Sequence, residues 1–249
     1  MPEFPTYDGP VPYLTTAQMI EVDRAMMEDY RIDLIQMMEN AGRNLAHLAR
    51  VRFLDGDPRG RAVIILAGSG GNGGGALVAA RRLHNYGAQV RVITTRPAHA
   101  YTGIRARQLD ILDRMGVPVG PVGSTSRLPV PDLILDGIIG YSLQGAPHGT
   151  AAGLIRWANA VPAPRLALDV PSGLDATAGP IHEPVIAAAA TLTLALPKTG
   201  LRAPGAARFT GELYLADISV PPALYASPAL GLEEGPIFAR SEIVRLSAP

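Results

Sequence analysis

A chain of 249 residues, 47% hydrophobic and 18% charged, has the composition of a globular protein that can bury its own core. Its 22 basic and 22 acidic side chains give a formal net charge of zero, which argues against nucleic acid or an anionic membrane surface as a partner. Cysteine is absent, which excludes disulfides, thiolate metal sites and cysteine nucleophiles and leads us to expect a cytoplasmic protein.

The N-terminal part of the chain predicts an extended arm followed by two helices. Residues 1–14 are rich in proline with little periodicity, and no basic region followed by an apolar stretch indicates a secretory signal. Thr15 and Gln18 have the spacing of a capping box, so a helix is predicted to start there. A second helix is predicted to open at Asp33, with Gln36 three residues on and apolar residues at helical spacing beyond it.

Beyond residue 60 the pattern changes to short apolar runs that alternate with helical segments. The runs are rich in Val, Ile and Leu without polar alternation, as expected for strands covered on both faces. This order of strands and helices favours a parallel sheet with right-handed crossovers. Strands are predicted at residues 61–67, 89–95, 132–136, 165–170, 190–196 and 212–218, and helices at residues 74–86, 104–115 and 150–160.

We predict a three-layer α/β/α Rossmann-like fold with a mainly parallel central sheet, built as one domain over residues 1–249. The proline-rich segment 117–131 is interpreted as a loop and short connection, not as a domain linker. Residues 222–249 are interpreted as a C-terminal tail, in which 241–246 favours a last short helix or strand. The longest apolar run, 185–196, is too short to span a bilayer, so no membrane partner is expected.

A glycine-rich loop links the first of these strands to the first helix between strands. Gly68-Ser-Gly-Gly-Asn-Gly73 matches G-x-G-x-x-G, and glycines let a ligand approach the backbone amides that open a helix. The next strand, however, ends in threonines and Arg96, where dinucleotide-binding folds place an acid for the ribose. No Lys-Ser or Lys-Thr follows, which excludes a Walker loop. The loop therefore indicates phosphate or nucleotide contact, or else a turn that allows close helix–strand packing.

Two of the predicted strands end in aspartate, at Asp136 and Asp169. Ligands of open parallel sheets bind outside the carboxyl ends of the strands, so both carboxylates are expected beside the glycine loop. A carboxylate that leaves a buried strand is costly unless it has a partner or a function, although each could simply cap a local loop.

The residues leave several chemical roles open. Asp169 could act as a general acid and base if burial tunes it. Asp136, Ser172 and the side-chain carbonyl of Asn72 are oxygen donors that could together ligate a hard cation. Ser172 could instead be a nucleophile, but none of the five histidines stands in a motif-like relation to it and the G-x-S-x-G pattern is absent.

In order and spacing, segments between residues 14 and 222 resemble the YjeF N-terminal domain family, the NAD(P)H-hydrate epimerases. The most specific segment is Ala167-Leu-Asp-Val-Pro-Ser-Gly-Leu-Asp175. The other matching segments are Met38-Glu-Asn-Ala-Gly42, 68–82, 135–149, Leu196-Pro-Lys-Thr-Gly-Leu201 and Gly211-Glu-Leu-Tyr-Leu-Ala-Asp-Ile218.

The resemblance implies an isomerase that interconverts the R and S forms of hydrated NADH or NADPH, a nucleotide repair reaction. It implies Asp169 as general acid and base, a potassium ion held by Asn72, Asp136 and Ser172, and a homodimer. Lys198 is implied as a helper, although a lysine on a surface loop is usually only solvated. Substrate contacts are implied for Gly71, Asn72, Gly73, Gly74, Gly75, Gly140, Tyr141, Ser142, Leu143, Gln144, Gly145, Ala146, Asp169 and Lys198.

The family loop usually reads G-N-N-G-G-D-G, and both its first Asn and its Asp are missing from residues 70–76, which read G-G-N-G-G-G-A. Gly71 stands at the first Asn, and Gly75 stands at the Asp, whose carboxylate could accept a ribose hydroxyl. Loss of such a hydrogen bond weakens binding by about 1.5–3 kcal/mol, or about 10- to 100-fold. A second hypothesis is therefore a non-catalytic nucleotide-binding or protein-interaction domain on the same fold. A third hypothesis is an NAD(P)-dependent oxidoreductase, but the sequence lacks both the ribose-binding acid and a Tyr-x-x-x-Lys dyad that such an enzyme would need.

Overall fold

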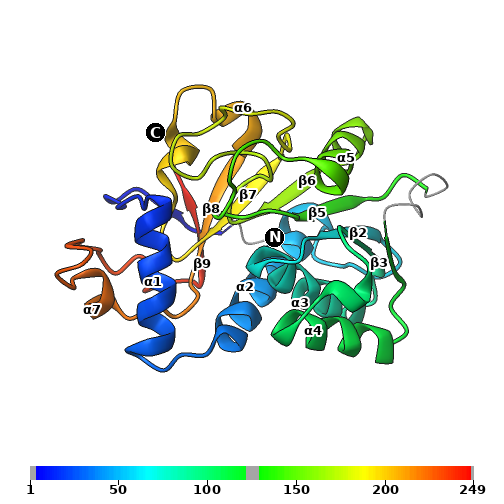
Figure 1. Cartoon of the computed structure of the whole chain (residues 1–249), viewed down its shortest axis with the longest axis horizontal. Helices are drawn as coiled ribbons and strands as arrows, with labels where there is room; N and C mark the ends of the chain where they lie inside the picture. Colours follow the sequence, from blue (N-terminus) through cyan, green and yellow to red (C-terminus); the bar gives the residue numbers. More distant parts are fainter. Residues whose placement is uncertain (1–3, 122–128, 248–249) are drawn as a thin grey trace.

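The computed structural model describes residues 4–121 and 129–247 and arranges them around one twisted sheet (Figure 1). Within these ranges nine strands are joined in the order β1-β9-β8-β7-β6-β5-β2-β3-β4. Neighbouring strands run parallel except β8 and β9, which pair antiparallel, so the predicted mainly parallel sheet is confirmed. The strands are β1 (Thr6–Tyr7), β2 (Ala62–Ala67), β3 (Gln89–Thr94), β4 (Val119–Pro121), β5 (Leu133–Gly137), β6 (Arg165–Leu168), β7 (Ala190–Leu194), β8 (Glu212–Ala216) and β9 (Ile243–Leu246).

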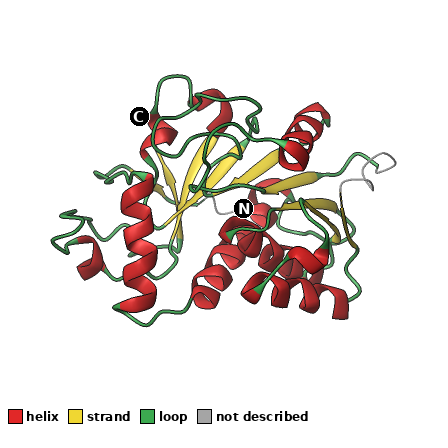
Figure 2. Cartoon of the chain, in the orientation of Figure 1, coloured by secondary structure: helices red, strands yellow, loops and turns green. Residues whose placement is uncertain are grey.

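Helices cover both faces of the sheet (Figure 2). In the described part of the chain they are α1 (Thr16–Glu28), α2 (Leu34–Leu48), α3 (Gly71–Asn85), α4 (Gly103–Arg114), α5 (Gly149–Ala160), α6 (Ala207–Thr210) and α7 (Pro222–Tyr225). Val63 and Ile65 of β2 pack in one core with residues of α2 and α3, whereas Ile64 and Leu66 pack in another with residues of α5. Because successive side chains enter opposite cores, β2 reads as an unbroken apolar run.

Capping interactions start the first two helices, as the sequence predicts. The Thr15 N–H donates to Gln18 Oε1 at 2.9 Å, and the Gln18 N–H donates back to Thr15 Oγ1 at 3.3 Å. Before α2, the Asp33 N–H donates to Gln36 Oε1 at 2.7 Å. Donors at a helix start have no partner within the helix, so these bonds fix where α1 and α2 begin.

Strands β6 and β7 end earlier than predicted. β6 ends at Leu168 because Asp169 has a left-handed φ of 68°, and β7 ends at Leu194 because Ala195 has a φ of 62°. A left-handed residue cannot continue a strand, so the chain turns sharply at both points. Asp169 is thereby placed just outside the carboxyl end of β6.

Both ends of the chain contribute to the sheet. The arm predicted over residues 1–14 contains β1, and the tail predicted over 222–249 contains α7 and β9, so 241–246 includes a strand and no helix. The connection predicted over 117–131 contains β4, and its residues 122–128 lie outside the described ranges. No helix in those ranges is long and apolar enough to cross a membrane.

Candidate functional site

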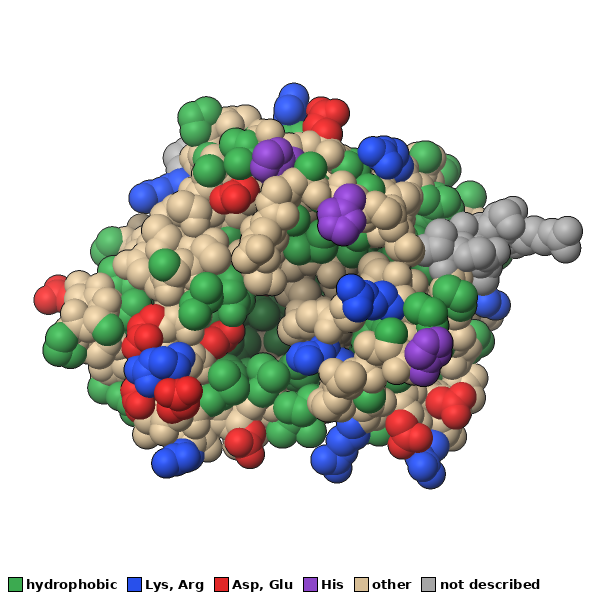
Figure 3. All heavy atoms as spheres, viewed as in Figure 1, with side chains coloured by type: hydrophobic (Ala, Val, Ile, Leu, Met, Phe, Trp, Pro, Cys, Tyr) green, Lys and Arg blue, Asp and Glu red, His purple; other side chains and the backbone are tan. Residues whose placement is uncertain are grey.

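A pocket of about 550 Å³ lies at the carboxyl ends of β2, β5 and β6. Its walls come from the start of α3, from residues between Ile138 and Ala151, and from the inner sides of α1 and α2. The pocket opens as a hollow near the centre of the face seen in Figure 3. This edge is where open parallel sheets bind their ligands.

The glycine loop forms one wall of the pocket. Helix α3 begins at Gly71, earlier than predicted, and the Gly74 N–H already donates to Gly70 O at 3.2 Å. The loop and the helix pack so closely that a Cβ at Gly73 would lie 1.8 Å from Gly68 O. By contrast, a Cβ at Gly70 or Gly71 would meet no atom of the described residues within 4 Å. The loop thus brings backbone groups to the pocket without side chains in front of them.

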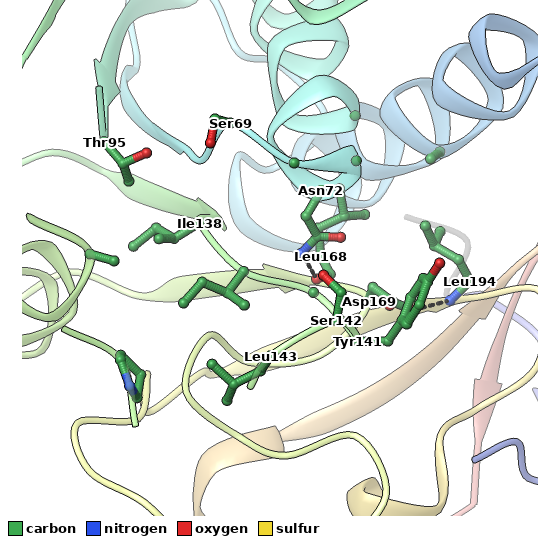
Figure 4. Close-up of a pocket in the computed structure, with 18 of the residues that line it drawn as sticks. Ser69, Asn72, Thr95, Ile138, Tyr141, Ser142, Leu143, Leu168, Asp169 and Leu194 are labelled. Carbon is green, nitrogen blue, oxygen red and sulfur yellow. Dashed lines mark hydrogen bonds between the residues drawn. The ribbon is translucent and has the colours of Figure 1, made fainter. Parts of the chain in front are cut away.

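An ion pair between Asp169 and Lys198 lies beside the turn that follows β6. Figure 4 shows Asp169 near Leu194 at this side of the pocket. Lys198 Nζ donates to Asp169 Oδ1 at 2.5 Å and to Leu194 O at 2.8 Å, and the Leu194 N–H donates to the same Oδ1 at 3.3 Å. Thr193 Oγ1 is also 3.4 Å from Oδ1. Among the described residues, Asp169 Oδ2 has no hydrogen-bond partner. One carboxylate oxygen is therefore held and the other is available to a ligand.

Lys198 is not a solvated surface residue, because its side chain is fully buried. The N-terminal segment before α1 covers it: the Leu14 N–H donates to Pro197 O at 2.8 Å, and the Thr199 N–H donates to Leu14 O at 2.9 Å. Leu14 itself has no exposed surface. The interpretation of Lys198 as merely solvated is therefore wrong. Sequence spacing could not show this burial, because it does not reveal that the N-terminal arm crosses the turn that carries Lys198.

A second carboxylate, Asp23 of α1, enters the pocket and was missed by sequence reasoning. It accepts a short hydrogen bond from the Tyr141 hydroxyl, and Thr16 Oγ1 donates to Tyr141 O at 3.4 Å. Burial raises the pKa of Asp23, while the Tyr141 hydroxyl and the charge of Lys198 oppose that shift. Burial, followed by the charge of Asp23, also raises the pKa of Tyr141. Helix α1 thus fixes the first residues of the loop that faces the glycine wall.

Asp136 lies fully buried, outside the set of residues that line the pocket. Ser172 Oγ donates to its Oδ1 at 2.6 Å, the Ser172 N–H donates to its Oδ2 at 2.8 Å, and the Ile138 N–H donates to Oδ1 at 3.2 Å. Burial raises the pKa of Asp136 to about 6, although these hydrogen bonds oppose the rise. None of the described lysines, arginines or histidines forms an ion pair with it.

Asn72 approaches the same region from the start of α3. Its Nδ2 donates to Leu168 O at 2.7 Å, and its Oδ1 lies where a Cβ on Gly140 would come within 2.8 Å. The Ile139 N–H donates to Ser172 Oγ at 2.8 Å, so Ser172 reaches the segment next to Gly140 from the other side. The three predicted cation ligands, Asn72, Asp136 and Ser172, therefore lie around one short segment of backbone, residues 138–140.

The structure distributes the predicted substrate-binding residues unevenly around the pocket. Those that line it are Gly71, Asn72, Gly75, Gly140, Tyr141, Ser142, Leu143, Gln144, Ala146, Asp169 and Lys198. Gly73, Gly74 and Gly145 do not line it. Gly74 instead packs on α2, where an added Cβ would lie 2.6 Å from Met38 Sδ. Pocket residues that the site prediction left out include Asp23, Thr95 and Arg96.

Sequence signals for these omitted residues are weak. Asp23 sits in a helix whose neighbouring charges form ordinary surface ion pairs, such as Arg24 with Glu21 at 2.6 Å. Its role depends on a contact with Tyr141, 118 residues away in the chain, which no local pattern shows. Arg96 carried a signal, since it stands just after the strand, where an acid was expected and not found.

Comparisons with known proteins agree with this architecture. The chain is 42% identical to an NAD(P)H-hydrate epimerase of Dehalogenimonas lykanthroporepellens over 99% of its length and 98% of that protein. It is 36% identical to an NAD(P)H-hydrate epimerase of Rhodopirellula baltica, covering 85% of this chain and 86% of that one. A crystal structure of the yeast protein ynu0 superposes with a TM-score of 0.79 at 25% identity, covering 95% of this chain and all of that one.

The fold and the site together define a Rossmann-like α/β protein with a buried aspartate–lysine pair at the carboxyl edge of its sheet. Residues 34–200 match the family described as YjeF-related protein N-terminus, and the chain belongs to that family. The resemblance found in the sequence is thereby confirmed.

Proposed function

We propose that this protein is an NAD(P)H-hydrate epimerase, an isomerase acting on NADH or NADPH that carries a hydroxyl group on its reduced nicotinamide ring. The observation that carries the proposal is the buried Asp169 carboxylate, with Oδ1 held by Lys198 and Oδ2 without a partner among the described residues. Relatives 36–42% identical over most of the chain bear that name, which supports the same assignment.

The reaction exchanges the face of the ring that bears the hydroxyl. The ring nitrogen pushes out the hydroxyl as its oxygen is protonated, so the C–O bond breaks, water leaves and a flat cationic ring remains. Water then adds to the opposite face and loses a proton. Asp169 suits both steps, because a carboxyl group can protonate the leaving hydroxyl and, as carboxylate, accept the proton of the incoming water. Its negative charge also stabilises the cationic ring.

The other residues of the pocket hold and orient the substrate. Lys198 and the Leu194 N–H fix Asp169 Oδ1, which leaves Oδ2 to exchange the proton. The open backbone at Gly70 and Gly71 lies at the start of α3, where unpaired N–H groups attract the substrate's phosphates. Residues 140–146 close the opposite side, anchored through Tyr141 to Asp23.

The direct test follows one epimer of NADPH hydrate, separated by chromatography, as it converts to the other with and without purified protein. We expect clear acceleration over the spontaneous rate. No acceleration with either NADH hydrate or NADPH hydrate would overturn the assignment. A domain that only binds nucleotide or protein would bind NADP⁺ in calorimetry and leave the rate unchanged; the named relatives do not favour that alternative.

Potassium binding, with Asn72, Asp136 and Ser172 as ligands, is part of the proposal. The donor set fits, because carboxylate, amide and hydroxyl oxygens suit a hard cation. The fully buried Asp136 also has only neutral partners among the described residues, which leaves its charge uncompensated. A bound potassium ion would compensate the negative charge of Asp136 and hold the backbone near Ile139 in place. KCl should therefore raise the melting temperature more than choline chloride does, and Asp136→Asn should abolish the difference.

Homodimer formation and residence in the cytoplasm complete the proposal. On α1, Ile20 is 55% exposed, Met27 39% and the nearby Tyr30 41%, which gives an apolar surface that a second copy could cover. Light scattering should give the mass of a dimer for the wild type and of a monomer for Ile20→Glu. The absence of cysteine from the sequence supports residence in the reducing cytoplasm, and cell fractionation would test that location.

A further inference from the structure

The order of the strands gives the pocket a direction. The strands β3, β2, β5 and β6 are consecutive neighbours, and their carboxyl ends lie along one edge of the sheet. β3 and β6 are three strand spacings apart, or about 14–15 Å. Figure 4 shows Thr95 and Ser69 on one side of the pocket and Asp169 with Tyr141 on the other. If the nicotinamide lies at Asp169, the adenosine end of an extended dinucleotide reaches the end of β3.

Arg96 lies at that far end. It follows β3 by two residues, is exposed, and lines the pocket. Besides Arg96, the one lysine or arginine among the described residues that line the pocket is Lys198, which is already paired with Asp169. The Arg96 guanidinium forms no ion pair with any carboxylate in the described ranges, although Asp23 and Asp169 share the pocket with it. It is thus a cation available to an anionic ligand.

The chemistry at this position separates the two nicotinamide nucleotides. In Rossmann-like folds the strand after the glycine loop ends beside the adenosine ribose, where an acid binds the free 2′-hydroxyl and an arginine accommodates a 2′-phosphate. Here β3 ends at Thr94 and is followed by Thr95 and Arg96, with no acid. Arginine binds phosphate through several donors at once, which makes such contacts strong.

We infer that Arg96 binds the 2′-phosphate of hydrated NADPH and makes this protein prefer NADPH hydrate to NADH hydrate. The inference rests on the proposed epimerase function, because it takes the position of the nicotinamide from Asp169. The substrate's pyrophosphate has its own place at the start of α3, where Gly70 and Gly71 leave the backbone open. The two anionic parts of NADPH therefore meet different elements, and only one part is absent from NADH.

The experiment compares kcat/KM for the two hydrates in the wild type, Arg96→Ala and Arg107→Ala. Arg107 is a matched control, because it is an exposed arginine on the neighbouring α4, forms no described ion pair and does not line the pocket. We expect Arg96→Ala to lower kcat/KM for NADPH hydrate by about 10- to 100-fold and for NADH hydrate by less than about threefold. Arg107→Ala should change neither value.

A third variant tests the same position in the opposite direction. Arg96→Asp restores the acid that binds a ribose diol, so the preference should shift towards NADH hydrate. Equal losses for both hydrates in Arg96→Ala would overturn the inference and assign Arg96 to the pyrophosphate, and no loss for either would also overturn it. If the wild type accelerates neither hydrate, the proposed function fails by itself. Calorimetry with NADP⁺ and NAD⁺ then decides the inference, which predicts that Arg96→Ala weakens NADP⁺ selectively.

Discussion

The two ends of the pocket are built differently. The reaction end, defined as Asp23, Tyr141, Asp169 and Lys198, consists of charged or hydroxyl-bearing side chains fixed to one another. Asp169 is 2% exposed, and Lys198 is fully buried. Every group there is positioned before a substrate arrives, as proton transfer at a defined atom requires.

The nucleotide end is defined as residues 69–72 together with Thr95 and Arg96. It offers fewer side-chain groups than the reaction end and is more exposed to solvent. An added Cβ at Gly70 or Gly71 would meet nothing within 4 Å in the described part of the chain, and Arg96 is exposed. Backbone amides and one unpaired cation suit an anionic ligand that must enter from water. The contrast teaches that substitutions at the reaction end should change rate and stability, whereas substitutions at the nucleotide end should change binding.

The largest effect is expected from Asp169→Asn. The amide keeps the shape of the side chain but cannot exchange a proton at this position, so kcat should fall about 100- to 10,000-fold. KM should change little, because the nucleotide end is untouched. Asp175→Asn is the control, since Asp175 belongs to the same segment but accepts the N–H groups of Thr177 and Ala178 away from the pocket. A kcat near that of the wild type would show that Asp169 is not the acid and base.

Lys198→Met should lower both stability and rate. It leaves the buried Asp169 carboxylate without its cation, and removal of one partner of a buried ion pair costs about 3–5 kcal/mol in the free energy of unfolding. Urea denaturation measures this loss. The double variant Lys198→Met with Asp169→Asn should recover much of the stability, because neither charge of this pair is then left buried without its partner. A double variant no more stable than Lys198→Met would contradict a role for the pair in stability.

The sequence predicts the central fold and one side of the site because those features are local. A run of apolar residues that ends in Asp136 or Asp169 is visible in one dimension, and strand order places both carboxylates on one edge. The burial of Lys198 could not be predicted in this way. It depends on Leu14, which lies on an arm with little periodicity and pairs with the backbone at Pro197 and Thr199.

Glycines account for another difference between sequence and structure. Glycine has low helix propensity, so a helix was predicted to start only at Gly74. In the structure the glycine run is itself the first turn, because Gly73 packs on the Gly68 carbonyl at a distance that excludes a Cβ, and Gly74 packs closely on the Met38 side chain. Tertiary packing thus overrides propensity at the place where the pocket needs an exposed backbone.

Gly75→Asp should strengthen the binding of the substrate's nucleotide part. Gly75 lines the pocket, and an added Cβ would lie 2.9 Å from the flexible tip of Leu168 and 3.6 Å from Ala41 Cβ, so a small shift admits the side chain. The carboxylate can accept a ribose hydroxyl, which should lower KM about 10-fold for both hydrates. Gly71→Asn is the comparison, because it restores the other family residue in open space. An unchanged KM for Gly75→Asp would mean that this residue does not face the ribose.

An effect of similar size is expected from Tyr141→Phe, which tests how far the two ends are independent. Tyr141 belongs to the loop that closes over the substrate, yet its hydroxyl is bound by Asp23 at the reaction end. Its removal leaves the half-buried Asp23 carboxylate unpaired and frees the loop, so kcat/KM should fall about 10-fold, shared between kcat and KM.

The control for Tyr141→Phe is Tyr225→Phe, because the buried Tyr225 hydroxyl has no hydrogen-bond partner among the described residues and lies outside the pocket. Combining Tyr141→Phe with Asp23→Leu removes both polar groups and should restore stability without restoring KM. Recovery of KM as well would show that the Asp23–Tyr141 bond only relieves a half-buried charge. Failure to recover it would show that Asp23, through Tyr141, couples the reaction end to substrate binding.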